Sequence, residues 1–259
     1  MKLLAVDRLS EWIEGLGRVM LLGRDAAAAI LARRLTWQDF VYQLYFVGVT
    51  SQLVVLITGA FTGMVLSTQT YFQFHQVKME TATLAVVSVA MCSELGAVLT
   101  GLMVAGRVGA SIAAELGTMR VTEQIDALRT LATHPVDYLV APRMLALLVA
   151  MPVLAVEAIA VGIGAGHLAG TVWLGIDPVF SWHNMLHYTQ VGDLAMGVLK
   201  AGVFGGLVGL IGCYKGMTCS EGAEGVGHAT TEAVVYASIA ILIVNFFITL
   251  GLGNWFHSL

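Results

Sequence analysis

The sequence predicts an all-α membrane protein with five transmembrane helices, preceded by helices at the membrane surface. Of its 259 residues, 58% are hydrophobic and only 12% are charged, whereas about a quarter of a soluble globular chain is charged. The mean hydropathy is +0.82. Five apolar runs are each long enough to cross the hydrocarbon layer, which takes roughly 20 helical residues. Composition and the lengths of these runs together define the fold class.

Residues 1–43 are predicted to form N-terminal interfacial, or elbow, helices. Hydrophobic residues recur there at helical spacing between charged ones, at Leu9, Ile13, Leu16 and Met20. This pattern is typical of a helix that lies in the membrane surface. A second helical piece is expected to end near Arg33 and Arg34. An ordinary cytosolic helix pair is the alternative. Charged residues interrupt the first 20 positions, so they do not form the apolar core of a signal peptide.

Residues 44–259 are predicted to form the transmembrane domain. The spans are expected at 47–68, 82–106, 144–174, 194–213 and 233–252. Glycines four residues apart share one helix face and allow close backbone packing, at Gly59 and Gly63 and at Gly162, Gly166 and Gly170. The connecting segments 71–80 and 214–232 are expected to be polar loops, and 175–193 is expected to be an aromatic-rich loop at an interface.

The basic residues predict that the N-terminus is cytoplasmic. This orientation places 11 of the 13 Lys and Arg residues in cytoplasmic segments, leaving Lys78 outside and Lys200 within a span. Short cytoplasmic loops carry such an excess of basic residues. Five spans then place the C-terminus in the periplasm.

A short amphipathic helix is predicted at about 120–132, on the cytoplasmic side. On a helical wheel, one side is apolar, at Val121, Ile125, Leu128 and Ala132, and the other is polar, at Thr122, Glu123, Asp126, Arg129 and Thr130. A polar-faced helix between two spans is a surface on which a soluble partner can act. A surface helix resting on the headgroups is the alternative.

The sequence lacks the common motifs for ATP hydrolysis and for membrane hydrolases. It has no GxxxxGK[ST] phosphate loop, no HExxH and no GxSxG. We therefore expect no catalytic residue and no cofactor of its own. His183 and His187 are spaced to share a metal, but no third ligand completes the pattern, so we expect interfacial aromatics rather than a metal site.

Ionisable residues within the spans are the candidates for function. Glu94, Glu157 and Lys200 lie in apolar runs, where a charge costs about 2.5–3.5 kcal/mol on insertion scales. They either neutralise one another locally or form a polar spot in an apolar cavity. The second arrangement suits an amphiphile with a charged head, because a small hydrophilic solute needs a more polar lining.

Several segments carry a family resemblance. The stretch 94–128 reads ELGAVLTGLMVAGRVGASIAAELGTMRVTEQIDAL, and further matches are QLYFVGVTS at 43–51, FTGMVLSTQ at 61–69, HPVDYLVAPR at 134–143, IGCYKG at 211–216 and GAEGVGHATTEAVV at 222–235. The chain resembles the MlaE permease family, the membrane subunits of lipid-transporting ABC systems that work with MCE-domain proteins.

The resemblance implies a function and partners. It implies a homodimeric permease in the bacterial inner membrane that moves phospholipid or a related lipid. The expected partners are an ABC ATPase that binds the ATP, an MCE-domain lipid-binding protein and a small cytoplasmic accessory protein. No nucleic acid is expected. The implied site residues are Glu94 and Lys200 near the lipid headgroup, and Glu123, Gln124, Asp126, Ala127 and Leu128 in the coupling helix that docks into the ATPase.

The chain departs from the family pattern at a few polar positions. Ser93 and Ala97 stand where Arg and Pro are common, and Asn245 stands where Asp is common. His228 and Glu232 replace residues that are often basic. Two other functions fit the composition. One is a proton-coupled secondary transporter that uses Glu94 and Glu157, although no inverted repeat is apparent. The other is a non-transporting envelope scaffold.

Overall fold

The computed structural model describes residues 2–32 and 36–256, and every regular element in this part of the chain is a helix. The long helices are α1 (Lys2–Leu31), α2 (Trp37–Gln76), α7 (Ala141–Val172), α9 (Val191–Met217) and α10 (Gly222–Phe256). The shorter helices are α3 (Thr83–Ala90), α4 (Gly96–Val104), α5 (Ala110–Val121), α6 (Gln124–Thr130) and α8 (Pro178–Tyr188). Four short segments join them, η1 (Glu80–Ala82), η2 (Met91–Leu95), η3 (Ala105–Gly109) and η4 (Val136–Val140).

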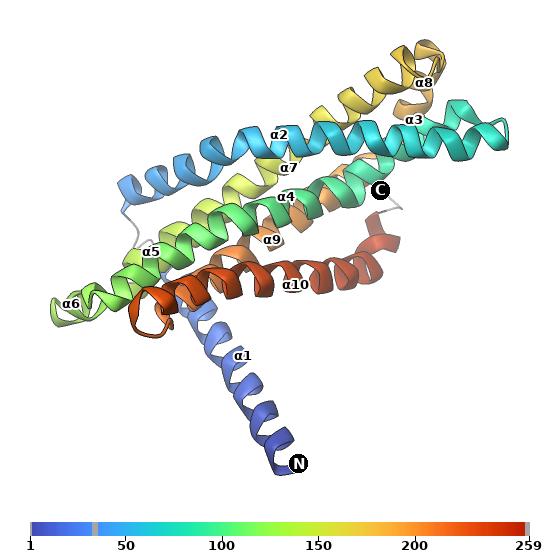
Figure 1. Ribbon diagram of the computed structural model, residues 1–259. Helices are drawn as coiled ribbons and strands as arrows, with labels where there is room; N and C mark the ends of the chain where they lie inside the picture. The colour runs from blue at the N-terminus through green and yellow to red at the C-terminus, as the bar shows by residue number, and fades with distance from the viewer. Residues whose placement is uncertain (1, 33–35, 257–259) are drawn as a thin grey trace.

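Five helices are long and apolar enough to cross a membrane, as the sequence predicted. They are α2, the continuous helix 80–121, α7, α9 and the apolar part of α10. They lie side by side, with α6 at one end of the bundle and α3 and α8 at the other (Figure 1). Helix α1 leaves the bundle at the α6 end and points away from the spans (Figure 1). Elements that the sequence places on opposite sides of the membrane therefore lie at opposite ends of the bundle.

Helices α2 and α7 pack backbone to backbone through the predicted glycine faces. A methyl group added at Gly59 would lie 2.7 Å from the carbonyl oxygen of Ala158. One added at Gly63 would collide with the carbonyl oxygen of Gly162, and one at Gly166 would lie 2.9 Å from that of Gly63. Side chains larger than hydrogen would hold the helices apart, so small residues are required at this contact.

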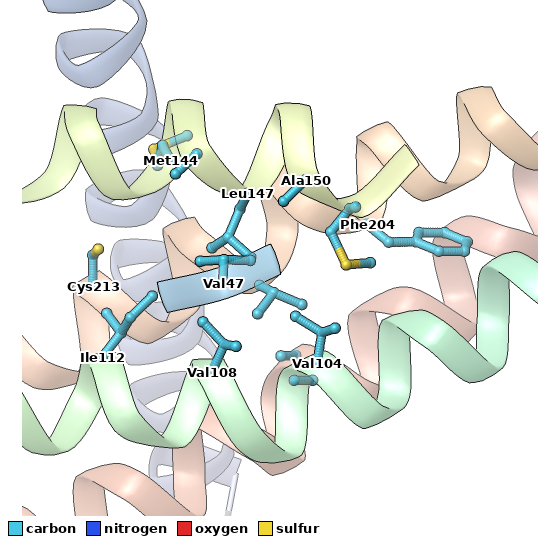
Figure 2. Packing of buried hydrophobic residues seen from close by; sticks show 14 of the residues in the cluster. Val47, Val104, Val108, Ile112, Met144, Leu147, Ala150, Phe204 and Cys213 are labelled. Carbon is cyan, nitrogen blue, oxygen red and sulfur yellow. The ribbon is translucent and has the colours of Figure 1, made fainter. Parts of the chain in front are cut away.

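The hydrophobic core lies between the spans at the α6-side half of the bundle. Val47 of α2 faces residues from three other spans, among them Val104, Val108, Leu147 and Phe204 (Figure 2). Each of these side chains is almost fully buried. By contrast, α2 and α10 bury the smallest shares of their apolar windows. These two helices therefore present the largest apolar surfaces to whatever surrounds the chain.

The connections are more helical than predicted. Helix α2 continues to Gln76 and α9 to Met217, and α10 already begins at Gly222, so the predicted loops 71–80 and 214–232 shrink to tight turns. The predicted loop 175–193 contains helix α8. Asp177 caps it by accepting a 2.8 Å hydrogen bond from the Phe180 amide, and Pro178 occupies its first turn. This Asp-Pro pair is a helix-start pattern that the prediction of an aromatic-rich interfacial loop did not take into account.

The N-terminal prediction also needs correction. Residues 2–31 form one unbroken helix rather than two pieces, and the first span extends back to Trp37 instead of starting after residue 43. Arg33 and Arg34 lie outside the described residues. The position of α1 relative to a membrane surface stays a prediction.

The second span is interrupted by two π-helical segments, which the sequence did not reveal. Segments η2 and η3 each insert a wide turn into the helix 80–121, and they contain Glu94 and Arg107 respectively. A π-turn adds a residue to the turn and shifts the direction of the side chains around it, and such turns are frequent at functional sites. Both charged residues between Thr83 and Ala113 thus lie on distorted turns.

Candidate functional site: an intramembrane ion pair beside an apolar groove

Glu94 and Lys200 form an ion pair inside the bundle. Glu94 lies in η2 and Lys200 in α9, and Lys200 Nζ is 2.6 Å from Glu94 Oε1. The Lys200 side chain is completely buried, whereas a third of the Glu94 side chain is exposed. Of the two arrangements that the sequence left open, local pairing is therefore present, and Glu94 rather than Glu157 is the partner.

The Lys200 ammonium group uses all of its donors within the chain. Besides Glu94, it donates to the Ser93 carbonyl oxygen at 3.0 Å and to Thr249 Oγ1 at 2.8 Å. An ammonium group has three N–H donors. A ligand that contacts Lys200 directly would have to displace one of these acceptors.

Helix α10 completes the network with two residues that the sequence analysis did not select for the site. Asn245 Nδ2 donates to Glu94 Oε2 at 3.0 Å, and Thr249 Oγ1 lies 2.9 Å from Glu94 Oε1. The spacing of four residues places both on one face of α10, which is a pattern the sequence contains. An amide at position 245 donates to the carboxylate, which an aspartate could do only when protonated. The Asn245 amide therefore stabilises the Glu94 carboxylate, whose preceding residue is Ser93 and not an arginine.

An apolar groove of about 390 Å³ borders the pair. It lies between α2 and η2 and is lined by Phe61, Thr62, Val65, Leu66, Gln69 and Leu95. Leu95 directly follows Glu94 in the same π-turn. Glu94 therefore joins the polar network, and Leu95 lines the groove. The η2 turn therefore contributes both to the polar network with α9 and α10 and to the apolar groove against α2.

Glu157 belongs to a different contact. Gln52 Nε2 of α2 donates to Glu157 Oε2 of α7 at 3.3 Å. The pair joins the same two helices as the glycine contact. Glu94 and Glu157 thus have separate polar partners.

The predicted amphipathic helix 120–132 is a helix–turn–helix rather than one helix. Helix α5 ends at Val121, Glu123 adopts a left-handed conformation with φ of 58°, and α6 begins at Gln124. Because of this turn, the residues of the predicted apolar face do not all lie on one side of a single helix. Ile125 is buried and Leu128 packs on the core, as predicted. Val121 is exposed because the turn separates it from that side, and Ala132 is exposed because α6 ends at Thr130 and Ala132 has a positive φ of 57°.

The residues predicted to contact an ATPase divide into two groups. Glu123, Gln124 and Ala127 are exposed at the end of the bundle. Asp126 instead pairs with Arg120 at 2.7 Å and with Arg129 at 2.9 Å, and so fastens α6 to the end of α5. Leu128 packs inward. The exposed surface is therefore smaller than the predicted set.

A second ion pair connects this hairpin to the next span. Arg143 of α7 is nearly buried and pairs with Glu115 of α5 at 2.8 Å, while its other terminal nitrogen donates to the Leu139 carbonyl oxygen at 2.7 Å. Arg143 thus joins α5, η4 and α7. This contact and the apolar core both join the hairpin to the third span.

The histidines at the opposite end lie on α8. The rings of His183 and His187 stack with centroids 6.5 Å apart, and His187 packs edge-on against Tyr188. Within the described ranges, no third His, Cys, Asp or Glu joins them in a metal-sized group.

The fold and the site together define the class of protein. It is an all-α membrane protein with five spans, an ion pair beside an apolar groove and a polar hairpin at one end. The chain belongs to the family described as Permease MlaE, whose pattern matches residues 40–250.

Similar proteins are found in bacteria and in a plant. The chain is 43% identical to a "Probable ABC transporter permease protein" of Rickettsia felis, over 93% of each chain. It is 38% identical to the "Intermembrane phospholipid transport system permease protein MlaE" of Haemophilus influenzae, over 81% of this chain and 80% of the relative. It is 34% identical to the chloroplastic protein TRIGALACTOSYLDIACYLGLYCEROL 1 of Arabidopsis thaliana, over 88% of this chain and 65% of that protein.

Proposed function

We propose that this chain is the permease subunit of an ABC transporter that moves phospholipid or a related lipid between the bacterial inner membrane and an MCE-domain partner. A separate ATPase supplies the energy. The observation that carries the proposal is the apolar groove beside Glu94, because its chemistry matches the two ends of a lipid. The name of the Haemophilus relative, which refers to phospholipid transport, supports it.

The groove and the ion pair divide the recognition of a lipid between them. The apolar walls at Phe61, Val65 and Leu66 take an acyl chain through van der Waals packing, since the chain comes from an equally apolar bilayer. The exposed part of Glu94 faces the headgroup. Lys200 holds that carboxylate in place and becomes a direct headgroup ligand only if the pair opens.

The hairpin at the other end docks the ATPase. Glu123, Gln124 and Ala127 form the contact surface, while Asp126 and Leu128 keep the hairpin rigid on the bundle. A second copy of the chain, an MCE-domain protein and a small cytoplasmic accessory protein complete the assembly. The α6 end then lies in the cytoplasm and the α8 end in the periplasm.

The test measures lipid that co-purifies with the assembled transporter. Leu66→Glu places a charge on the groove wall, and Val54→Glu is a control on the exposed surface of the same helix. We expect Leu66→Glu to lower bound phospholipid and lipid-stimulated ATP hydrolysis several-fold, with Val54→Glu close to the parent. Equal phospholipid content in both variants would reject the groove as the lipid site.

The alternative functions predict different results. A proton-coupled transporter moves its substrate without an ATPase and loses activity in Glu94→Gln or Glu157→Gln. A non-transporting scaffold tolerates Leu66→Glu. Capture of an ATPase by the parent chain, lost in Glu123→Lys, separates the ABC permease from both.

A further inference from the structure

Arg107 lies at a position where a charge needs compensation. It is half-buried in the π-turn η3 and follows directly on the predicted second span, which ends at Gly106. Its contacts are with α2, where it meets Thr50 and Ser51. Thirteen residues separate it from Glu94, or about 20 Å along a helix. Arg107 therefore belongs to the α6-side half of the bundle and is distinct from the groove and its ion pair.

Arg107 lacks the carboxylate partner that comparable arginines have. Each other arginine whose side chain the structure describes pairs with an Asp or Glu, namely Arg18, Arg24, Arg120, Arg129 and Arg143. Within the described part of the chain, Arg107 has only neutral partners. An arginine near the end of an apolar span extends its guanidinium to the membrane interface, where lipid phosphate groups lie.

The neutral contacts hold the guanidinium in one orientation. Nη1 donates to Thr50 Oγ1 and to Ser51 Oγ, each at 2.8 Å, which uses both of its N–H groups. The Thr50 hydroxyl is itself fixed by donating to the Phe46 carbonyl oxygen. The Phe46 ring centre lies 6.0 Å from the guanidinium carbon.

This orientation leaves one edge of the guanidinium available. Nε and Nη2 have no hydrogen-bond partner among the described residues, and neither is among the buried polar atoms that lack a partner. The Nε–Nη2 edge therefore reaches the protein surface with its N–H groups unpaired. Two parallel donors on a planar group match a phosphate or carboxylate in a bidentate arrangement.

The face of α2 that includes Thr50 is largely apolar and exposed. Phe46, Val49, Thr50 and Leu53 share one face of α2 at helical spacing, and Val49 and Leu53 are 54% and 69% exposed. A soluble anion gains nothing from such a surface, whereas the acyl chains of a lipid cover it favourably. The anion and the apolar surface thus come from the same molecule.

We infer that Arg107, held by Thr50 and Ser51, binds the phosphate group of a phospholipid in the membrane leaflet at the α6 end, with the acyl chains along Val49 and Leu53. The site is separate from the groove beside Glu94. Lipid binding at Arg107 requires neither ATP nor transport. It can therefore be tested whether or not the chain has the proposed transport function.

The experiment measures which lipids contact this face. The full-length chain carries the photoreactive residue p-benzoylphenylalanine in place of Val49. It is placed in nanodiscs of a phosphate-free galactolipid that contain equal amounts of phosphatidylglycerol and diacylglycerol with the same acyl chains. After irradiation, mass spectrometry gives the ratio of the two adducts. Random contact gives the bulk ratio, so enrichment of phosphatidylglycerol reports recognition of the headgroup.

Four substitutions and one competitor, inorganic phosphate, complete the test. We expect several-fold enrichment of phosphatidylglycerol in the parent and in the control Arg18→Gln, which removes an exposed arginine paired with Glu14. Arg107→Gln should return the ratio to that of the bulk. Arg107→Lys keeps the positive charge but lacks the two parallel donors of the guanidinium, so it should retain part of the enrichment. This variant provides the test if Arg107→Gln fails to fold.

Several outcomes would overturn the inference. Enrichment that survives in Arg107→Gln shows that another group selects the lipid. Full enrichment in Arg107→Lys rules out the two-donor edge. Loss of the enrichment on adding inorganic phosphate identifies a soluble anion as the ligand. Enrichment that persists in Glu94→Gln is expected, because the groove site is a different one.

Discussion

Glu94 and Lys200 form a 2.6 Å ion pair in which the cation is completely buried and the anion is one-third exposed. The two members are therefore not equivalent. Removing Glu94 strands a buried cation, whereas removing Lys200 leaves a carboxylate that Asn245 and Thr249 still hold.

This asymmetry predicts the order of stabilities. We expect Glu94→Gln to lower the free energy of unfolding by about 3–5 kcal/mol, the usual cost of an unpaired buried charge, and Lys200→Met to lower it less. The double variant should recover most of the loss. Thermal unfolding of the purified chain in detergent measures the three values. Additive losses in the double variant would contradict a coupled pair.

The lipid content of the same variants tests the proposed role of Glu94. If the pair serves only the fold, the double variant should hold as much lipid as the parent. If Glu94 faces the headgroup, the double variant should be stable yet hold less. Mass spectrometry of co-purified lipid distinguishes the two, and restored stability with normal lipid content would reject the headgroup role.

The glycine contact between α2 and α7 predicts a position-specific effect on stability. Gly63→Ala inserts a methyl group against the Gly162 carbonyl, so we expect a loss of about 1–3 kcal/mol from overpacking. Gly48→Ala on the same helix meets nothing within 4 Å and should be neutral. Unfolding temperatures compared in the same detergent check this. Equal effects at both positions would contradict the close contact.

The turn at Glu123 allows its side chain to be tested apart from its backbone. Glycine adopts a positive φ without strain, so Glu123→Gly should keep the hairpin, whereas Glu123→Lys reverses the charge on the same turn. We expect the lysine variant to lose ATPase binding and the glycine variant to weaken it, with both folded. Pull-down of the ATPase and the unfolding temperature are the measurements. Full ATPase binding in both variants would exclude Glu123 from the interface.

The two ends of the bundle predict opposite labelling. In a background without other cysteines, Leu186→Cys on α8 should react with an impermeant maleimide in intact spheroplasts. Ala127→Cys on α6 should react only after the membrane is opened. The reverse pattern would overturn the topology and the docking of an ATPase at α6.

Cys219 provides a pH-dependent measurement at the α6 end. It lies between α9 and α10, and burial raises the pKa of its thiol above the usual value, with the nearby Arg120 opposing the rise. Only the thiolate is alkylated. At neutral pH the modification rate should therefore be lower than that of an exposed cysteine introduced at Ala32, and the difference should narrow as pH rises. Equal rates throughout would contradict the burial of this thiol.

Much of the candidate site was predictable from residue type and much was not. Glu94 and Lys200 could be selected because a charge in an apolar run is costly wherever it lies. Asn245 and Thr249 could not, because a neutral polar residue in a span is common and becomes informative only beside its partner. Asp126 was predicted on the exposed polar side, and although Arg129 lies three residues further along the same helix, only the turn at Glu123 brings Arg120 of α5 to it.

The sequence by itself determined the number of spans and the helix faces that pack closely. Crossing a bilayer requires a long apolar run, and close packing requires small residues at regular spacing, and both are local properties. Only the tertiary structure decided that Glu94 and Arg107 lie on π-turns, that Glu94 is the partner of Lys200, and that the chain turns at Glu123. Each of these depends on contacts between segments far apart in the chain, such as Lys200 of α9 meeting Glu94 of η2 and Thr249 of α10. A local sequence pattern cannot specify which distant side chains a residue meets, so these features had to come from the tertiary structure.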